Sequence, residues 1–163
     1  MRLVKSNSYF LIVTSFLASF FLMMLPLPHA LVWLRPPFTF IFLMYWMLAS
    51  PERCNLGFAF CVGLFLDMLV GTPLGLHALV FVLIGFFVLK YAKAVVHFSL
   101  WQQAGAVALL AGSHVLIQGW LLTWFDHRAF HIVHLLSAAT TFLIWPPLSL
   151  LLDRLRPRVL AHI

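Results

Sequence analysis

The sequence predicts an all-α integral membrane protein with six transmembrane helices in a single domain, residues 1–163. Of its 163 residues, 64% are hydrophobic and only 9% are charged, whereas a soluble domain carries about 25% charged residues. The apolar residues gather into stretches of the length that crosses a bilayer, about 20 residues for each helix. The segments between these stretches are short, so little of the chain could form a soluble domain.

Six apolar segments are predicted to be the spans, and turn-forming residues separate them. Pro26 and Pro51 follow the first two segments, and Gly71-Thr72-Pro73 forms a turn after the third. The first segment is longer than the apolar part of a signal peptide, so we interpret it as a retained span. Arg35-Pro36-Pro37 argues against one continuous helix in the second. The approximate spans are 9–25, 30–49, 55–70, 74–89, 100–125 and 130–152.

The basic residues predict that both ends of the chain lie in the cytoplasm. The formal net charge is +6, but the basic residues are dispersed between apolar runs, so no nucleic-acid partner is expected. If the loops alternate between two sides, one side receives most of the Lys and Arg residues, and that side is the cytoplasmic one. There we expect contact with anionic lipid or a cytoplasmic filament. The predicted inner residues are Arg2, Lys5, Arg53, Lys90, Lys93, Arg154, Arg156 and Arg158, and the outer ones are Arg35 and Arg128.

Asp67 is the acidic residue that lies well inside a predicted span. A carboxylate at the bilayer centre costs about 2.5–3.5 kcal/mol on insertion scales, so it normally faces protein or water and has a partner. We expect Arg35 to be its counter-charge; an ion or proton pathway and simple hydration are the alternatives. Gly63, Asp67, Gly71 and Gly75 recur at intervals of four. Because small residues let helices approach closely, Asp67 is predicted to point into a tight helix contact.

Polar residues in three other places could carry a function. A group at the start of the last span could ligate a metal, but we favour histidines at the membrane interface and expect no metal. His114 and Gln118 are expected to form hydrogen bonds between helices. A face of small residues on the first span could receive another helix, either from this chain or from a partner. The first group is Asp126, His127, His131 and His134, and the small-residue face is Thr14, Ser15, Ala18 and Ser19.

Catalysis is not expected. The sequence has no G-x-S-x-G, H-E-x-x-H or phosphate-binding glycine loop. The four acidic residues are scattered over loops and opposite sides of the predicted bundle, so no acid pair is formed. Cys54 and Cys61 are interpreted as small buried apolar side chains rather than a disulfide or a metal site. We therefore expect no cofactor.

An ordered set of short motifs resembles the family of the rod shape-determining protein MreD, in its proteobacterial form. The likeness is strongest over Arg35–Gly75 and covers almost the whole chain. Its motifs are Leu34-Arg35-Pro36, Tyr45-Trp46, Pro51-Glu52-Arg53-Cys54-Asn55-Leu56-Gly57, Gly63-Leu64-Phe65-Leu66-Asp67, Gly71-Thr72-Pro73-Leu74-Gly75, Leu100-Trp101-Gln102-Gln103 and Trp145-Pro146.

The resemblance implies a multi-pass protein of the bacterial inner membrane that takes part in the cell-elongation complex and has no enzymatic activity. It implies association with MreC and, in the same complex, with MreB, RodA and a class B penicillin-binding transpeptidase. It also implies a fold similar to the substrate-binding subunits of energy-coupling-factor transporters. The residues that match the family pattern are Arg35, Pro36, Asn55, Gly57, Gly63, Asp67, Gly71 and Gly75.

Three other functions are open to the same sequence. A small-molecule-binding subunit of a membrane transporter would share the expected fold. However, such subunits dock their coupling protein through A-x-x-x-A on the first span, and this chain has only a looser face of small residues there. An intramembrane enzyme or an ion channel would have to rely on Asp67 alone among membrane-embedded acids.

Overall fold

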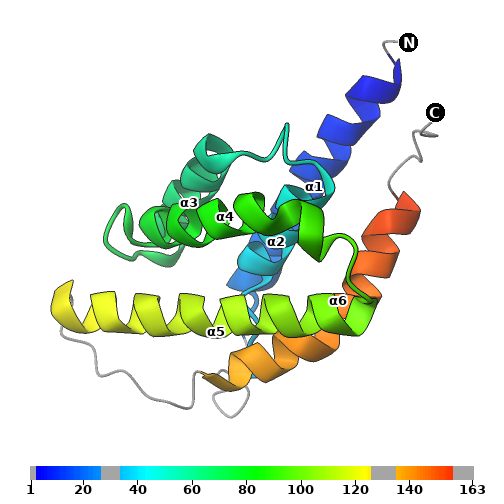
Figure 1. Cartoon of the computed structure of the whole chain (residues 1–163). Coiled ribbons are helices and arrows are strands. Elements are labelled where there is room, and N and C mark those ends of the chain that lie inside the picture. The colour runs from blue at the N-terminus through cyan, green and yellow to red at the C-terminus, as the bar shows by residue number, and fades with distance from the viewer. Residues whose placement is uncertain (1–2, 27–33, 126–134, 156–163) are drawn as a thin grey trace.

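The computed structural model describes residues 3–26, 34–125 and 135–155, and the regular structure within these ranges is helical throughout (Figure 1). This confirms the all-α prediction. The helices are α1 (Leu3–Met24), α2 (Phe38–Ala49), α3 (Leu56–Val70), α4 (Leu76–Val95), α5 (Leu100–Phe125) and α6 (Leu136–Leu155).

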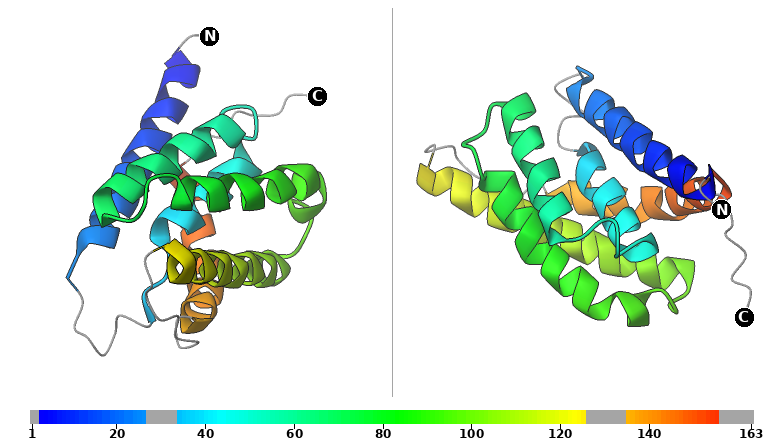
Figure 2. Two further views of the ribbon diagram at one scale, coloured as in Figure 1. Left: turned by 90° about the vertical axis from the view of Figure 1, so that its left-hand side faces the viewer. Right: turned by 90° about the horizontal axis from the view of Figure 1, so that it is seen from above.

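α2 forms the centre of the bundle. Nine of its 12 residues are buried, and it contacts α1, α4, α5 and α6 (Figure 2). Its sequence has apolar side chains on every face, as expected for a helix enclosed by other helices. Two polar contacts hold it in place: the Trp46 indole N–H donates to the Ser15 hydroxyl oxygen at 2.8 Å, and the Tyr45 hydroxyl donates to the Asp153 carboxylate at 2.6 Å.

Within the second predicted span, 30–49, the helix that the structure describes is α2, which begins at Phe38, directly after Pro36 and Pro37. Residues 30–33 lie outside the described residues, so the bounds of this span stay a prediction. Proline lacks an N–H and restricts the residue before it, so a helix can begin after these prolines but not run through them. At 1.5 Å per residue, α2 is about 18 Å long, which is less than the hydrocarbon thickness of about 30 Å.

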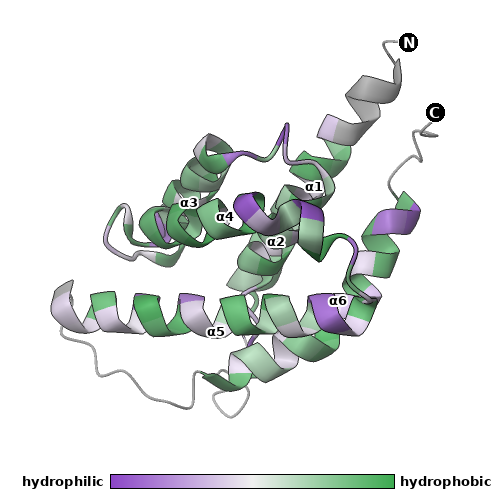
Figure 3. Cartoon of the chain, in the orientation of Figure 1, coloured by the Kyte–Doolittle hydropathy of each residue, from purple (hydrophilic) through white to green (hydrophobic). Residues whose placement is uncertain are grey.

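Within the residues that the structure describes, three helices are long and apolar enough to cross a membrane. They are α4, α5 over Leu100–Trp124, and α6, whereas Tyr9–Met24, α2 and α3 are shorter apolar helices. A multi-pass membrane protein is therefore supported, and six crossings stay a prediction. α4 continues to Val95, beyond its predicted end at residue 89, and α6 covers Leu136–Leu155 where 130–152 was predicted. In Figure 3, hydrophobic residues recur along these helices, and hydrophilic residues are fewer.

α3 and α4 form an antiparallel hairpin whose closest point is Gly63. A Cβ atom on Gly63 would lie 2.4 Å from the Cα of Ala78, so only glycine permits this approach of the two backbones. The predicted close contact at Gly63 is therefore present, and it joins two helices of the same chain. The surface around Gly63 is thus occupied internally and is not available to a partner.

The start of α1, the end of α6 and the α4–α5 connection lie at one end of the bundle (Figures 1 and 2). The α3–α4 turn lies at the opposite end. An even number of crossings would produce this arrangement, and the cytoplasmic location of both termini stays a prediction.

We expect reporter fusions to place both termini in the cytoplasm. Green fluorescent protein fused to either terminus should fluoresce, and alkaline phosphatase fused to the C-terminus should be inactive, because the first folds in the cytoplasm and the second only outside it. A phosphatase fusion that is active at one terminus and inactive at the other would exclude an even number of crossings.

We expect Gly63→Ala to lower the thermal unfolding midpoint of the protein in mild detergent by roughly 2–12 °C, because overpacking costs about 1–3 kcal/mol. Gly105→Ala is the matched control, since a Cβ on Gly105 of α5 would meet no atom within 4 Å. That change should leave stability equal or slightly higher, because alanine favours a helix. Equal midpoints for both variants would contradict the close α3–α4 contact.

Candidate functional site

The Asp67 side chain is completely buried at the end of α3, with 0% of its surface exposed. Its Oδ1 atom accepts hydrogen bonds from the Thr72 hydroxyl at 2.8 Å, from the His77 backbone N–H at 3.0 Å and from His77 Nδ1 at 2.7 Å. Its Oδ2 atom accepts from the backbone N–H of Gly75 at 2.9 Å. Every donor belongs to the α3–α4 turn or the first turn of α4.

Two glycines let the chain wrap around this carboxylate. Gly71, the C-cap of α3, has φ +72°, and Gly75, the N-cap of α4, has φ +95°; glycine adopts this left-handed region without steric cost. The backbone N–H groups of Gly71 and Thr72 donate to the Asp67 carbonyl oxygen at 2.9 and 3.2 Å. Asp67 therefore ends α3 with its backbone and begins α4 with its side chain, which places a negative charge at a helix N-terminus.

His77 connects this turn to α5. It is 2% exposed, and its Nε2 atom lies 2.8 Å from the amide nitrogen of Gln118. Because an amide nitrogen can only donate, Nε2 accepts this hydrogen bond, which assigns the ring proton to Nδ1, where it faces Asp67. Asp67, His77 and Gln118 thus form one chain of hydrogen bonds across α3, α4 and α5.

His114 lies beside this chain of hydrogen bonds without joining it. It is 3% exposed, and neither ring nitrogen has a hydrogen-bond partner within the described ranges. Its ring stacks on Phe40 of α2 with centroids 4.8 Å apart, and the His77 ring is 6.0 Å away. The expected hydrogen bond between helices is therefore confirmed for Gln118 and is wrong for His114, which packs as an aromatic ring.

The expected pairing of Asp67 with Arg35 is wrong. The Arg35 guanidinium instead donates to the Leu22 carbonyl oxygen at 2.6 Å, near the end of α1. The Asp67 oxygens are already engaged by groups of the adjacent turn, which are brought to them by the chain reversal itself. Arg35 thus connects the α1–α2 region, and the buried Pro36 lies just before α2.

Asn55 and Gly57 form the start of α3. The Asn55 side chain accepts a hydrogen bond from the Phe58 backbone N–H at 3.0 Å, as expected for an N-cap. A Cβ on Gly57 would lie 3.4 Å from that side-chain oxygen. The neighbouring Cys54 is buried, and burial raises the pKa of its thiol to about 12, as expected for a cysteine that packs in the protein interior. Cys61, expected to be buried, is exposed on α3.

The small-residue face of α1 is used mainly within the chain. Ser15 and Ser19 are buried, and Ser15 accepts the hydrogen bond from Trp46. Ala18 is exposed. Internal packing is thus the role of the two serines.

The group of Asp126, His127, His131 and His134 lies outside the described residues. Within residues 3–26, 34–125 and 135–155, no three His, Cys, Asp or Glu side chains are placed to hold a metal ion.

The hydrogen bonds around Asp67 stabilise the arrangement of α3, α4 and α5. Each carboxylate oxygen and each ring nitrogen of His77 is engaged by another group of the chain. Sequence reasoning identified Asp67 and Gln118 but overlooked His77. The Gly71-Thr72-Pro73-Leu74-Gly75 turn was the available signal, because it returns the chain to Asp67 at the first turn of the next helix.

Comparison with known proteins shows similarity of the whole chain to one family. A family described as rod shape-determining protein MreD matches residues 4–155. The rod shape-determining protein MreD of Haemophilus influenzae is 32% identical to this chain over 155 residues, which cover 94% of this chain and 95% of the relative. No solved structure matches the chain.

We expect Asp67→Asn to destabilise the protein by about 3–5 kcal/mol, because the amide places a donor against donors and leaves His77 without its charged partner. The thermal midpoint in detergent should fall by roughly 6–20 °C. The matched control is Asp153→Asn, which weakens one hydrogen bond at an exposed position and should cost about 1 kcal/mol or less. Comparable losses in the two variants would show that Asp67 does not hold the hairpin.

Proposed function

The chain belongs to the family of the rod shape-determining protein MreD, a family of cell-shape proteins, and from this premise we propose that it is a non-catalytic scaffold of the bacterial cell-elongation complex. In this proposal it lies in the inner membrane, binds MreC directly and helps position or activate peptidoglycan synthases. MreB, RodA and a class B penicillin-binding transpeptidase would be its other partners in the complex.

Both carboxylate oxygens of Asp67 already accept hydrogen bonds from the chain, and this observation most supports a non-catalytic role. A general acid or base needs a free oxygen or nitrogen within reach of a substrate. Asp67 and His77 have none, because hydrogen bonds from the chain itself engage them and both side chains are buried. The residues that match the family pattern here shape a hairpin, so the proposed role is to present helix surfaces of fixed geometry.

The outward face of α1 is the proposed surface for the transmembrane helix of MreC. Phe10, Val13, Leu17 and Phe21 follow one another at helical spacing, and between 56% and 69% of each residue is exposed. The opposite face of α1 is engaged within the chain. Ser15 accepts a hydrogen bond from α2, and the ring of Phe16 packs against Phe58 of α3 with centroids 5.2 Å apart. α1 therefore keeps its internal contacts while offering an uncharged stripe to a second helix.

We expect Leu17→Trp, alone or with Val13→Trp, to reduce co-purification of MreC in mild detergent to a small fraction of the wild-type amount, because a larger ring prevents close helix packing. Leu143→Trp is the matched control, since Leu143 is a similarly exposed leucine on α6. Its MreC yield should remain at the wild-type level.

Equal folding of the variants is checked by their thermal midpoints. Full MreC retention by the α1 variants, or its loss in the α6 variant, would reject α1 as the docking helix. Failure of the wild-type protein to retain MreC would reject direct binding.

A further inference from the structure

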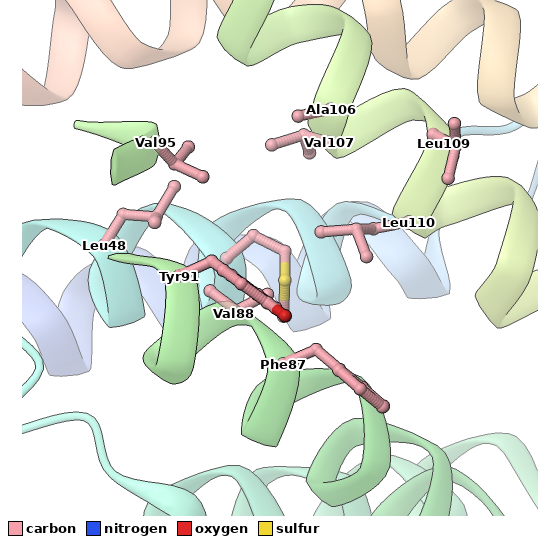
Figure 4. A pocket seen from close by; sticks show the side chains of 10 residues that line it. Leu48, Phe87, Val88, Tyr91, Val95, Ala106, Val107, Leu109 and Leu110 are labelled. Atoms are coloured by element: carbon pink, nitrogen blue, oxygen red, sulfur yellow. The ribbon is translucent and has the colours of Figure 1, made fainter. Parts of the chain in front are cut away.

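A pocket with an apolar lining lies between α2, α4 and α5 (Figure 4). Its residues on α4 lie in the half of that helix that is farther along the chain from the α3–α4 turn. Its volume is about 290 Å³, roughly twice that of an engineered 150 Å³ protein cavity that takes up benzene. Met44 from α2, Val88 and Tyr91 from α4, and Ala106 and Leu110 from α5 are among its lining residues. Apart from the Tyr91 hydroxyl and the Met44 sulfur, every lining side-chain atom is carbon.

The pocket opens toward the outside of the bundle. Met44 and Val107 form buried parts of its wall, whereas Tyr91 is 55% exposed and Leu109 is 71% exposed. In a membrane-embedded chain, this outer side faces lipid tails. A guest could therefore enter sideways from the bilayer.

Positive charge lies near the pocket, at the same end of α4. The Lys90 ammonium is 5.7 Å from the centroid of the Tyr91 ring, which itself lines the pocket. Lys93 follows within one helical turn and is also exposed. The segment 86–103, which contains the end of α4 and the start of α5, has no Asp or Glu. Ser99 and Gln102 cap the N-terminus of α5 there, and its dipole adds positive potential.

We propose that this pocket binds one acyl chain of an anionic phospholipid, whose head group is attracted by Lys90 beside the pocket and by the positive charge that Lys93 adds at the same end of α4. The carbon walls select a hydrocarbon chain, because a polar metabolite would need polar groups to orient it. The two lysines select a negative head group, and each adds attraction near the membrane surface. The sequence predicted contact with anionic lipid, and this pocket is the proposed site for it. The proposed lipid binding does not depend on MreC binding.

Native mass spectrometry of the detergent-purified protein tests the proposal. With phosphatidylglycerol added, one lipid should remain bound at activation energies that remove phosphatidylcholine. Ala106→Phe, which fills the pocket, should lower phosphatidylglycerol retention about tenfold or more, because excluding only two methylene groups already weakens apolar binding by that factor. Ala106→Leu is the milder variant if the first does not fold.

The lysines are tested separately from the pocket. Lys90→Gln with Lys93→Gln should reduce the preference for phosphatidylglycerol over phosphatidylcholine toward equality. Ala139→Phe, which repeats the alanine-to-phenylalanine change, and Arg154→Gln, which likewise removes a positive charge, are the controls. Both lie at exposed positions of α6 and should leave retention unchanged.

Undiminished retention in the pocket-filled variant, or equal retention of both lipids by the wild-type protein, would overturn the proposal. A photo-crosslinker at Leu110 that captures a protein in cells, and not lipid, would show that a partner helix occupies the pocket. MreC co-purification should be unaffected by these variants, so a failure here is distinct from a failure of the scaffold proposal.

Discussion

A buried carboxylate in a nearly uncharged set of helices is the constraint on which the rest of the structure depends. Removing Asp67 from water is unfavourable unless donors of the chain replace the lost hydration. Thr72, Gly75 and His77 supply them within ten residues of sequence. Because these donors lie on both sides of a chain reversal, satisfying the carboxylate also fixes how α4 leaves α3. The approach of the two helices at Gly63 follows from that geometry.

The hairpin then determines where the remaining helices can pack. His77 links the turn to α5 by accepting a hydrogen bond from Gln118. One helical turn earlier on α5, the ring of His114 stacks on Phe40 of α2. α2 is thereby enclosed, which explains how a 12-residue apolar helix can sit at the centre of a membrane protein. The helix surfaces left over, including the outer face of α1, are those that a partner can reach.

The sequence predicted the helical structure and the importance of Asp67. It did not predict which helix faces contact one another. Prolines and glycines predicted the helix ends because their backbone limits are local. The burial of α2 was not predicted, since lipid and protein interior are equally apolar and periodicity cannot separate them. Arg35 was assigned to Asp67 on charge alone, whereas a backbone turn provides neutral donors that charge counting overlooks. Among the histidines in the part of the chain that the structure describes, only His77 sits directly after a turn that returns to an acid.

The two ends of α4 differ in a way that suits a scaffold. Its first turn is bound to α3 and α5 through buried hydrogen bonds, while its last turns carry exposed Lys90, Tyr91 and Lys93 beside an apolar pocket. The buried, hydrogen-bonded carboxylate of Asp67 is shielded from water, so ions and hydration that vary with the surroundings have little effect on it. The lysine end, in contrast, interacts through surface charge, which depends on the lipid present. One helix thus joins a part that stabilises the fold to a part that carries the proposed lipid site.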